Sequence, residues 1–183
     1  MIHMKVVQPI RNIDDIHKMK KALSSNRRNQ FMFVFGIQIA LRISDMLQLK
    51  VKDIKDQTHL IIKEGKTGKT RRQIISNNLR KDITEYTKNM KDDQWLFPSR
   101  EGNQPISRIQ AYRILNSKAK EIGLKEIGSH TLRKTFGFHF YQQTNDIVTL
   151  QKLFNHSSPE ITIRYVGVNQ DIMDEKLINF NII

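Results

Sequence analysis

The stretch from Ser129 to Tyr165 constrains the fold more than any other part of the chain, because its apolar residues recur at helical spacing. That spacing predicts two amphipathic helices in succession. Ser158 followed by Pro159 is typical of an N-cap and a first helical position, so a third helix should begin there. The apolar positions are Leu132, Phe136 and Phe140 in the first helix and Leu150, Leu153 and Phe154 in the second.

Four polar residues are set into this apolar pattern. His130 and Arg133 should lie one turn apart on the same face of the first helix. His156 falls in the turn before the third helix, and Tyr165 lies within that helix. Histidine, arginine and tyrosine on three consecutive short helices are therefore candidates for a functional site.

Helical patterns also cover much of the rest of the chain, whereas residues 48–76 have a different character. The segments LQLKVKDI, THLIIKEG and RRQIISNN are short and rich in β-branched residues, with turn residues between them. They predict a small antiparallel sheet of three strands. The expected fold is therefore mainly α with a small three-stranded antiparallel sheet, an α+β arrangement.

The length of 183 residues fits one domain. We expect an N-terminal lead-in over residues 1–11, where Pro9 disfavours a helix. The domain itself should cover residues 12–168. Residues 169–183 should form an apolar C-terminal tail helix.

The charge of the chain points to a polyanionic partner. Its 31 basic and 18 acidic residues leave a formal charge of +13, so nucleic acid is the first candidate. Cysteine is absent, which excludes disulfides and thiolate metal sites. The sequence shows no signal peptide and no transmembrane segment, so we expect an intracellular, cytoplasmic protein without a membrane partner.

Two further basic features precede the stretch from Ser129 to Tyr165 in the chain. Arg42 lies in the most apolar part of the chain, where a guanidinium is costly unless an anion pairs with it. Asp45, three residues later, would share its helical face and could hold it in place. The loop GKTGKT at residues 65–70 lacks the spacing of a P-loop, so we interpret it as a hairpin tip that presents Lys66 and Lys69 to a phosphate.

Together these pieces resemble the catalytic domain of the tyrosine recombinases, the phage integrase family. They are ALRISDMLQL, EGKTGKTRRQI, SHTLRKTFGFHF, LQKLFNHSS and ITIRYVGV, in the order that the family shows. The 24 positions between Arg42 and Lys66 and the nine between His156 and Tyr165 are also similar to the family's spacings. The resemblance runs from about Asn12 to the C-terminus.

The resemblance implies a catalytic set of Arg42, Lys66, His130, Arg133, His156 and Tyr165. Tyr165 would be the nucleophile that attacks a phosphodiester and forms a 3′-phosphotyrosyl ester. Two forked guanidiniums suit the charge that gathers on the non-bridging oxygens. By resemblance Lys66 protonates the leaving 5′ oxygen, His130 assists proton transfer at the tyrosine and His156 hydrogen-bonds the phosphate.

The same resemblance implies double-stranded DNA as the substrate, with no metal and no cofactor. Lys69, Arg71, Arg72 and Lys134 are the expected DNA-binding residues around the site. Lys134 is a departure from the family, which often has a histidine at that position, outside the catalytic set.

Each assignment has a simpler alternative. A lone tyrosine is more often a half-buried core residue, and a lone histidine more often a packing or capping residue. Arg133 could pair with a nearby carboxylate, and Lys66 and Lys69 could be solvated hairpin charges. A metal site at His130, His139 and His156 is disfavoured, because no usual metal-ligand spacing occurs.

Two rival functions follow from the same residues. The chain could be a non-catalytic DNA-binding or regulatory module that keeps the fold, or it could act like a type IB topoisomerase. Family integrases usually carry a separate core-binding domain before the catalytic domain, and residues 1–11 are too few to supply it. We therefore expect a fragment or a stand-alone domain with weak activity alone, and a possible separate core-binding partner.

The C-terminal tail implies a further partner. In the family such a helix docks onto a neighbouring subunit on DNA, so the resemblance implies a homo-oligomer on DNA. The alternative is that the tail folds back onto its own core. The apolar residues of the tail are Ile172, Met173, Leu177, Phe180, Ile182 and Ile183.

Overall fold

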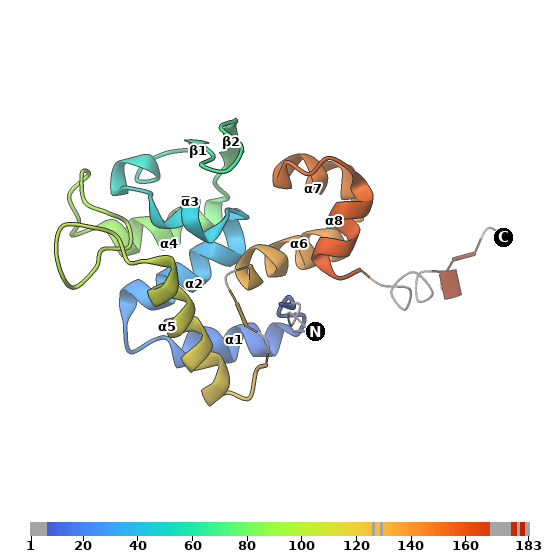
Figure 1. Ribbon diagram of the computed structural model, residues 1–183, viewed down its shortest axis with the longest axis horizontal. Helices are drawn as coiled ribbons and strands as arrows, with labels where there is room; N and C mark the ends of the chain where they lie inside the picture. Colours follow the sequence, from blue (N-terminus) through green and yellow to red (C-terminus); the bar gives the residue numbers. More distant parts are fainter. Residues whose placement is uncertain (1–6, 126, 129, 169–176, 179, 182–183) are drawn as a thin grey trace, which may run out of the picture.

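The computed structural model describes residues 7–125, 127–128, 130–168, 177–178 and 180–181, and it is mainly helical (Figure 1). The β1–β2 hairpin lies at the top of this view, α7 and α8 lie at the right, and α6 runs between α2 and α8. The elements are α1 (Ile13–Ala22), α2 (Arg27–Ile39), α3 (Ile43–Leu47), η1 (Val51–Asp53), β1 (His59–Lys63), β2 (Thr70–Ile74), α4 (Asn77–Thr87), α5 (Arg108–Glu121), α6 (Thr131–Thr144), α7 (Ile147–Phe154) and α8 (Pro159–Val166).

Local capping explains where several helices begin. A side-chain oxygen at the N-cap accepts a backbone N–H of the first turn and satisfies a donor that has no partner within the helix. Ser158 caps α8 in this way, and Pro159 occupies its first turn, as the sequence predicts. The other side-chain N-caps are Asn12, Asn26, Ser76, Ser107 and Asp146.

The sheet has two strands rather than the three expected between residues 48 and 76, all of which the structure describes. β1 and β2 pair antiparallel, with His59 opposite Ile74 and Lys63 opposite Thr70. The segment LQLKVKDI does not form the third strand, because Asp53 accepts the backbone N–H of Lys50 at 2.7 Å and closes a 3₁₀ turn. Its apolar residues are buried in the core instead, and only an isolated bridge joins Lys50 to Trp95.

The core has two parts. The larger part joins α1 to α5 around buried residues of α2 such as Phe33 and Phe35. The smaller part lies among α6, α7 and α8 and includes Phe138, Leu150 and Phe154, with Tyr165 packed against it. The residues expected to carry chemistry on α6 and α8 therefore border the smaller core.

Two glycines let α6 approach its neighbours closely. A Cβ at Gly36 of α2 would lie 2.5 Å from Cδ1 of Leu132 on α6. A Cβ at Gly137 of α6 would lie 2.5 Å from Val166 on α8 and 2.8 Å from the ring of Phe154 on α7. A side chain at either position would force these neighbours to shift, so the two glycines let α6 pack closely between α2 and the α7–α8 pair.

The segment before α1 packs against α6. The backbone N–H of Ile10 donates to Thr135 Oγ1 at 2.9 Å, and Arg11 donates to the carbonyl of Gly167 at 3.0 Å. Among the described residues no helix is long and apolar enough to cross a membrane. The expected tail helix lies largely outside the described residues, and among its described side chains Leu177 and Phe180 are each 66% exposed and Ile178 is 83% exposed.

Candidate active site

The junction between α2 and α3 forms the centre of the site. Ala40 adopts a left-handed conformation with φ of 56°, which ends α2 and leaves its last carbonyl groups without helical partners. Arg133 donates to Ala40 O at 2.9 Å, while Arg71 donates to Ala40 O at 3.1 Å and to Ile39 O at 3.3 Å. Two guanidiniums therefore bind the negative end of the α2 dipole.

Arg42 follows this junction as the N-cap residue of α3 and faces two carboxylates. Its Nη1 lies 2.8 Å from Glu64 Oε2 and 3.9 Å from Asp45 Oδ2. Asp45 also accepts the backbone N–H of Gly65 at 3.2 Å, so it links Arg42 to the hairpin. Asp45 therefore lies near Arg42, whereas the short ion pair of Arg42 is with Glu64.

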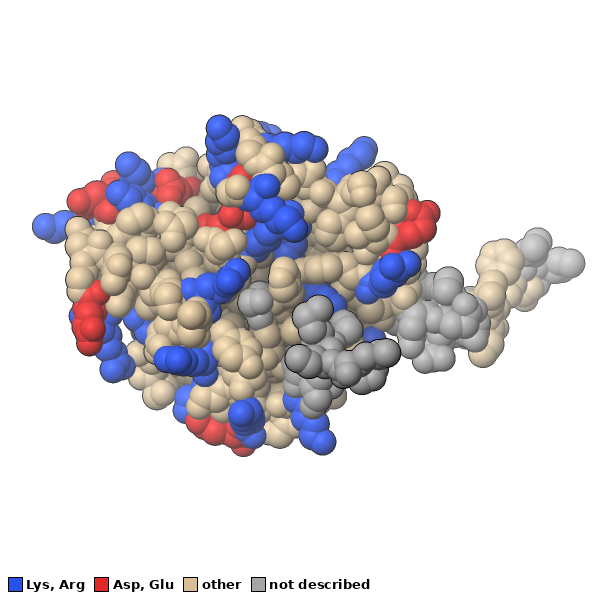
Figure 2. Space-filling model, viewed as in Figure 1, with Lys and Arg blue, Asp and Glu red and all other residues tan. Residues whose placement is uncertain are grey.

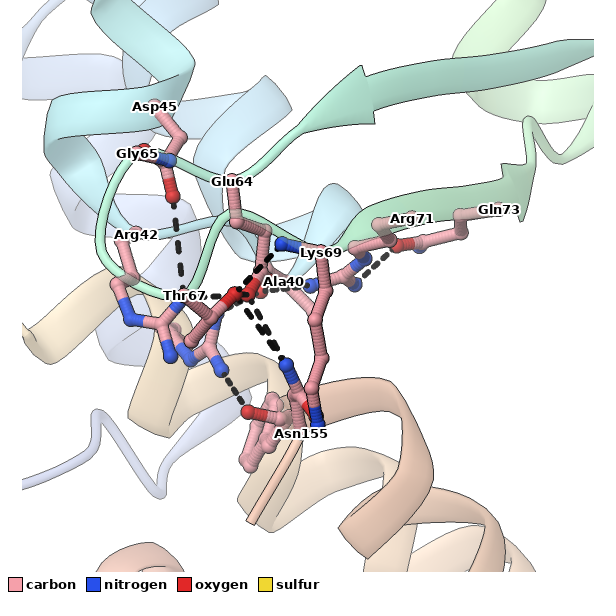
Figure 3. Close-up of polar contacts among 12 residues, drawn as sticks. Ala40, Arg42, Asp45, Glu64, Gly65, Thr67, Lys69, Arg71, Gln73 and Asn155 are labelled. Atoms are coloured by element: carbon pink, nitrogen blue, oxygen red, sulfur yellow. Dashed lines mark hydrogen bonds and ion pairs between the residues drawn. The ribbon is translucent and has the colours of Figure 1, made fainter.

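Glu64 connects three parts of the chain, as Figure 3 shows. The carboxylate is 1% exposed and lies between Arg42 and Arg71, with Arg71 Nη1 at 3.7 Å. It also accepts from Thr67 Oγ1 at 2.8 Å and from Asn155 Nδ2 at 3.4 Å. Burial acts to raise the pKa of Glu64, but Arg42, Thr67 and Asn155 together hold it below its ordinary value.

Arg133 lies beneath the site with 3% of its surface exposed. In addition to its bond to Ala40, it donates to the carbonyl of Phe154 at 2.7 Å, and its guanidinium carbon lies 4.5 Å from the centre of the Phe154 ring. Burial lowers the pKa of Arg133, and the charge of Arg42 lowers it further. Arg133 and Arg71 both donate to Ala40 O, and Arg71 and Arg42 both face Glu64, so the three guanidiniums belong to one site.

Tyr165 lies on α8 and contacts both histidines of the site. Its hydroxyl lies 3.1 Å from His130 Nδ1, and its ring packs edge-on against His156 at 5.2 Å and Phe154 at 5.4 Å between centroids. Burial raises the pKa of Tyr165, whereas the nearby charges of Arg133 and Arg42 lower it. The structure thus brings together Arg42, His130, Arg133, His156 and Tyr165, which are five of the six predicted catalytic residues.

The surroundings of His130 and His156 lower the pKa of both side chains, which favours their neutral forms. Partial burial, followed by the charge of Arg133, lowers the pKa of His130. Burial and the charges of Arg133 and Arg42 lower the pKa of His156 to about 4. His130 precedes α6 as its N-cap residue rather than lying within the helix, and His156 Nδ1 lies 3.0 Å from Thr162 Oγ1.

The lowered pKa of His156 predicts a pH dependence of stability. In the unfolded chain His156 takes up a proton near its ordinary pKa of about 6.5, whereas in the folded protein it does so only near about 4. Between these values the unfolded state binds more protons, so the free energy of unfolding falls as the pH is lowered.

We expect His156→Gln to remove this part of the pH dependence. Urea unfolding at about pH 8 and about pH 5 measures it, since both forms have a neutral side chain at the higher pH. An equal loss of stability between the two pH values in wild type and variant would contradict the expectation.

Lys66 is the predicted catalytic residue that lies apart from the other five. It is exposed on the hairpin tip, and its charge is nevertheless close enough to contribute to the lowered pKa of His130. Lys69 is also exposed and donates to Asn155 Oδ1 at 3.2 Å. Arg72 points outward from β2.

Two of the predicted DNA-binding residues lie inside the protein rather than on its surface. The Arg71 side chain is 9% exposed, and burial followed by the charge of Arg133 lowers its pKa to about 10. Lys134 is 8% exposed, and its Nζ lies 5.2 Å from the centre of the Tyr165 ring. Burial lowers the pKa of Lys134. Arg71 therefore contacts Ala40 and Glu64, and Lys134 contacts the ring of Tyr165.

The surface around the site is basic. Figure 2 shows Lys and Arg side chains gathered near the middle of this face, between the hairpin and the α6–α8 region. Within the described ranges, no group of three or more His, Cys, Asp or Glu residues is placed to hold a metal ion. His139 lies with its Nε2 2.9 Å from the carbonyl of Ile10, so it belongs to the packing of the N-terminal segment.

Sequence reasoning missed two residues of the site, Glu64 and Asn155. The signal for Glu64 is that it is the sole acid in the basic run KEGKTGKTRR. Asn155 precedes His156 and adopts a left-handed conformation with φ of 54°, which asparagine tolerates better than most residues. Neither pattern by itself identifies a partner.

Comparison with known proteins finds relatives among the integrases and recombinases. The sequence profile of the phage integrase family matches residues 10–171. The chain is 54% identical over 169 residues to the probable integrase/recombinase YoeC of Bacillus subtilis, covering 92% of this chain and 93% of that protein. It is 27% identical over 168 residues to tyrosine recombinase XerA of Pyrococcus horikoshii, covering 90% of this chain and 58% of XerA.

Solved structures share the fold. A crystal structure of XerA recombinase superposes with a TM-score of 0.77 at 22% identity, covering 98% of this chain and 65% of that one. A lambda integrase dimer bound to a COC′ core site gives a TM-score of 0.71 at 21% identity, covering 88% of this chain and 60% of that one. The mainly helical fold with a small antiparallel sheet is therefore that of the catalytic domains of these proteins.

Proposed function

The chain belongs to the phage integrase family of tyrosine recombinases, and on that premise we propose that it cleaves and rejoins double-stranded DNA through a 3′-phosphotyrosyl intermediate. The observation that carries the proposal is the hydrogen-bond distance of 3.1 Å between the Tyr165 hydroxyl and His130 Nδ1. The charges of Arg133 and Arg42 act on that hydroxyl. A nucleophile, a base and two anion-binding groups thus share one site.

The proposed first step is attack by the Tyr165 oxygen on the scissile phosphorus. His130 accepts the phenol proton, and its lowered pKa leaves the imidazole neutral and able to accept. The phosphorus–oxygen bond to the 5′ sugar breaks as the phosphotyrosyl bond forms. Lys66 donates a proton to the departing 5′ oxygen, and the reverse sequence reseals the strand.

Arg42 and Arg133 stabilise the phosphorane that forms between these steps. Each guanidinium has five N–H donors, so Arg133 can keep its bonds to Ala40 and Phe154 and still donate to a phosphate oxygen. Because these bonds hold the groups in place before DNA arrives, they lower the reorganisation needed in the transition state. His156 supplies a further hydrogen bond to the phosphate, from its Nε2 side.

A suicide substrate tests the function directly. A pool of duplexes with a randomised central sequence and a nick placed to release the 5′ product would trap any covalent intermediate, and sequencing of the trapped DNA would give the target site. We expect an adduct that resists denaturant and maps to the peptide containing Tyr165. Salt-sensitive binding without an adduct would favour the non-catalytic DNA-binding module instead. Relaxation of supercoiled plasmid without strand exchange would favour the topoisomerase-like alternative.

We expect Arg72→Gln to weaken binding to all DNA sequences alike, because Arg72 is exposed on β2 beside the site and would contact phosphates rather than bases. The slope of log affinity against log salt should fall by about one. Lys18→Gln is the matched control, since Lys18 is 60% exposed on α1, far from the hairpin in Figure 1. Equal effects of the two variants would argue against a DNA contact at Arg72.

The proposed catalytic unit is residues 12–168, and we propose that it works as part of a homo-oligomer on DNA. The exposed side chains of Leu177 and Phe180 support docking of the C-terminal tail onto a neighbouring subunit. The chain spans 58% of the length of Pyrococcus horikoshii XerA. We therefore propose that cleavage by these residues alone is weak and that a core-binding domain or protein strengthens it.

A further inference from the structure

We propose that Asn155 is a positioning residue that fixes the hairpin carrying Lys66 against the turn carrying His156. The inference rests on the proposed strand-cleavage function, in which Lys66 protonates the leaving oxygen. The contacts described for the Asn155 side chain are with Glu64, Thr67 and Lys69 and not with Tyr165.

The position of Asn155 in the fold suits this role. It ends α7 as the C-cap residue, with φ of 54° and ψ of 45°, and its backbone N–H donates to Lys152 O at 3.1 Å. The left-handed turn sends its side chain away from α7 toward the hairpin (Figure 3). His156 is the next residue, so a bond that fixes the Asn155 side chain also limits movement of the turn that carries His156.

Both the oxygen and the nitrogen of the Asn155 amide form hydrogen bonds to the hairpin. Its Oδ1 accepts from Lys69 Nζ at 3.2 Å. Its Nδ2 lies 3.4 Å from both Glu64 Oε2 and Thr67 Oγ1. Lys66 lies between these hairpin residues in the sequence, so the amide holds the chain on both sides of it.

These bonds bridge an open space. A cleft of about 310 Å³ lies between the hairpin and α7, lined by residues that include Lys69, Arg72, Lys152 and Leu153. Among the described residues, every hydrogen bond that joins residues 59–74 to α7 and its C-cap involves Asn155. Because packed side chains do not fill this space, the amide limits the movement of the hairpin tip relative to α7.

Glu64 extends the connection to the phosphate-binding arginines. The same Oε2 atom that faces Asn155 lies 2.8 Å from Arg42 Nη1. A carboxylate at position 155 would face Glu64 with like charge, whereas the amide donates to it. Asparagine is therefore suited both to the backbone conformation and to the charge of its neighbour.

The test compares two leaving groups. In one suicide substrate the scissile phosphate carries the normal 5′ oxygen, and in the other a bridging 5′ sulfur, which departs as a thiolate and needs no proton. General acid catalysis contributes about 10²–10⁴-fold, so Lys66→Ala should lose about that factor on the oxygen substrate and little on the sulfur substrate.

Asn155→Gly keeps a residue that tolerates the left-handed turn and removes the amide. We expect cleavage of the oxygen substrate to fall about tenfold, with cleavage of the sulfur substrate within about twofold of wild type. Asn145→Gly makes the same change at the left-handed C-cap of α6 and should leave both rates unchanged. Asn155→Asp should resemble Asn155→Gly, because it repels Glu64.

Equal losses on both substrates, or no loss on either, would overturn the positioning role. Hydrogen exchange provides a second readout that needs no activity. The hairpin amides of Glu64 and Gly68, which donate to Lys69 O and Glu64 O, should exchange faster in Asn155→Gly than in Asn145→Gly, and unchanged exchange would also overturn the inference. If wild type forms no adduct on either substrate, the proposed function fails instead, and the exchange comparison still decides whether Asn155 holds the hairpin.

Discussion

Tyr165→Phe should abolish the covalent adduct while leaving DNA binding intact. Removing a nucleophile lowers the rate by about 10⁴-fold or more, because the remaining groups have no atom to activate. The phenyl ring retains the contacts that Tyr165 makes with Phe154 and His156, so we expect the fold to be unchanged. The loss is confined to the hydroxyl that lies 3.1 Å from His130 Nδ1.

The measurement is adduct formation on the selected suicide substrate, with binding followed on the same DNA. Tyr112→Phe is the matched control, because Tyr112 is 44% exposed on α5 and should form the adduct at the wild-type rate. An adduct that persists in Tyr165→Phe would move the nucleophile to another residue and would refute the assignment.

Glu64→Gln should cause a large loss of stability, although glutamine has nearly the same shape as glutamate. The substitution removes the negative charge between Arg42 and Arg71 and leaves both cations with less compensation in a buried place. Removing one partner of a buried ion pair costs about 3 kcal/mol. For a chain of 183 residues this corresponds to a fall of about 6–12 °C in Tm.

Thermal and urea unfolding of wild type, Glu64→Gln and Glu85→Gln test this expectation. Glu85 is the control, since its side chain is 70% exposed and pairs with Arg27 and Lys88 at the surface, where ion pairs contribute little. An equal Tm for Glu64→Gln and Glu85→Gln would show that the buried carboxylate does not stabilise the fold.

Glu64 also predicts a dependence on pH. Its folded pKa lies below the unfolded value, so its contribution to stability is present above the ordinary carboxyl pKa. That contribution should be lost as the pH falls through the lowered pKa. Glu64→Gln should therefore lose less stability on acidification than wild type does.

Much of the fold could be predicted because its signals are local. The start of α8 at Pro159 follows from Ser158 and the proline themselves, and both act within one helical turn. The prediction of a third strand was wrong, and the reason is also local. Asp53 caps a 3₁₀ turn at Lys50, and that bond competes with strand pairing in a way that β-branched composition does not reveal.

The candidate site was predicted less evenly. His130, Arg133, His156 and Tyr165 form a recognisable pattern at short spacing, and the structure brings them together with Arg42. Whether a basic side chain faces DNA or the interior has no such local signal. Arg71 adjoins Arg72 in the sequence, but alternation along β2 turns it inward to the carbonyls that end α2.

Sequence by itself determined the residue types that the chemistry needs and the helices that carry most of them, because helical periodicity and capping depend on neighbours in the chain. Only the tertiary structure decided how these residues are held. Glu64 and Asn155 are 91 positions apart, and each interacts across elements whose approach depends on glycines such as Gly36 and Gly137. The stabilisation of a buried charge depends on partners from several elements, so the charge network of this site is a property of the packed molecule.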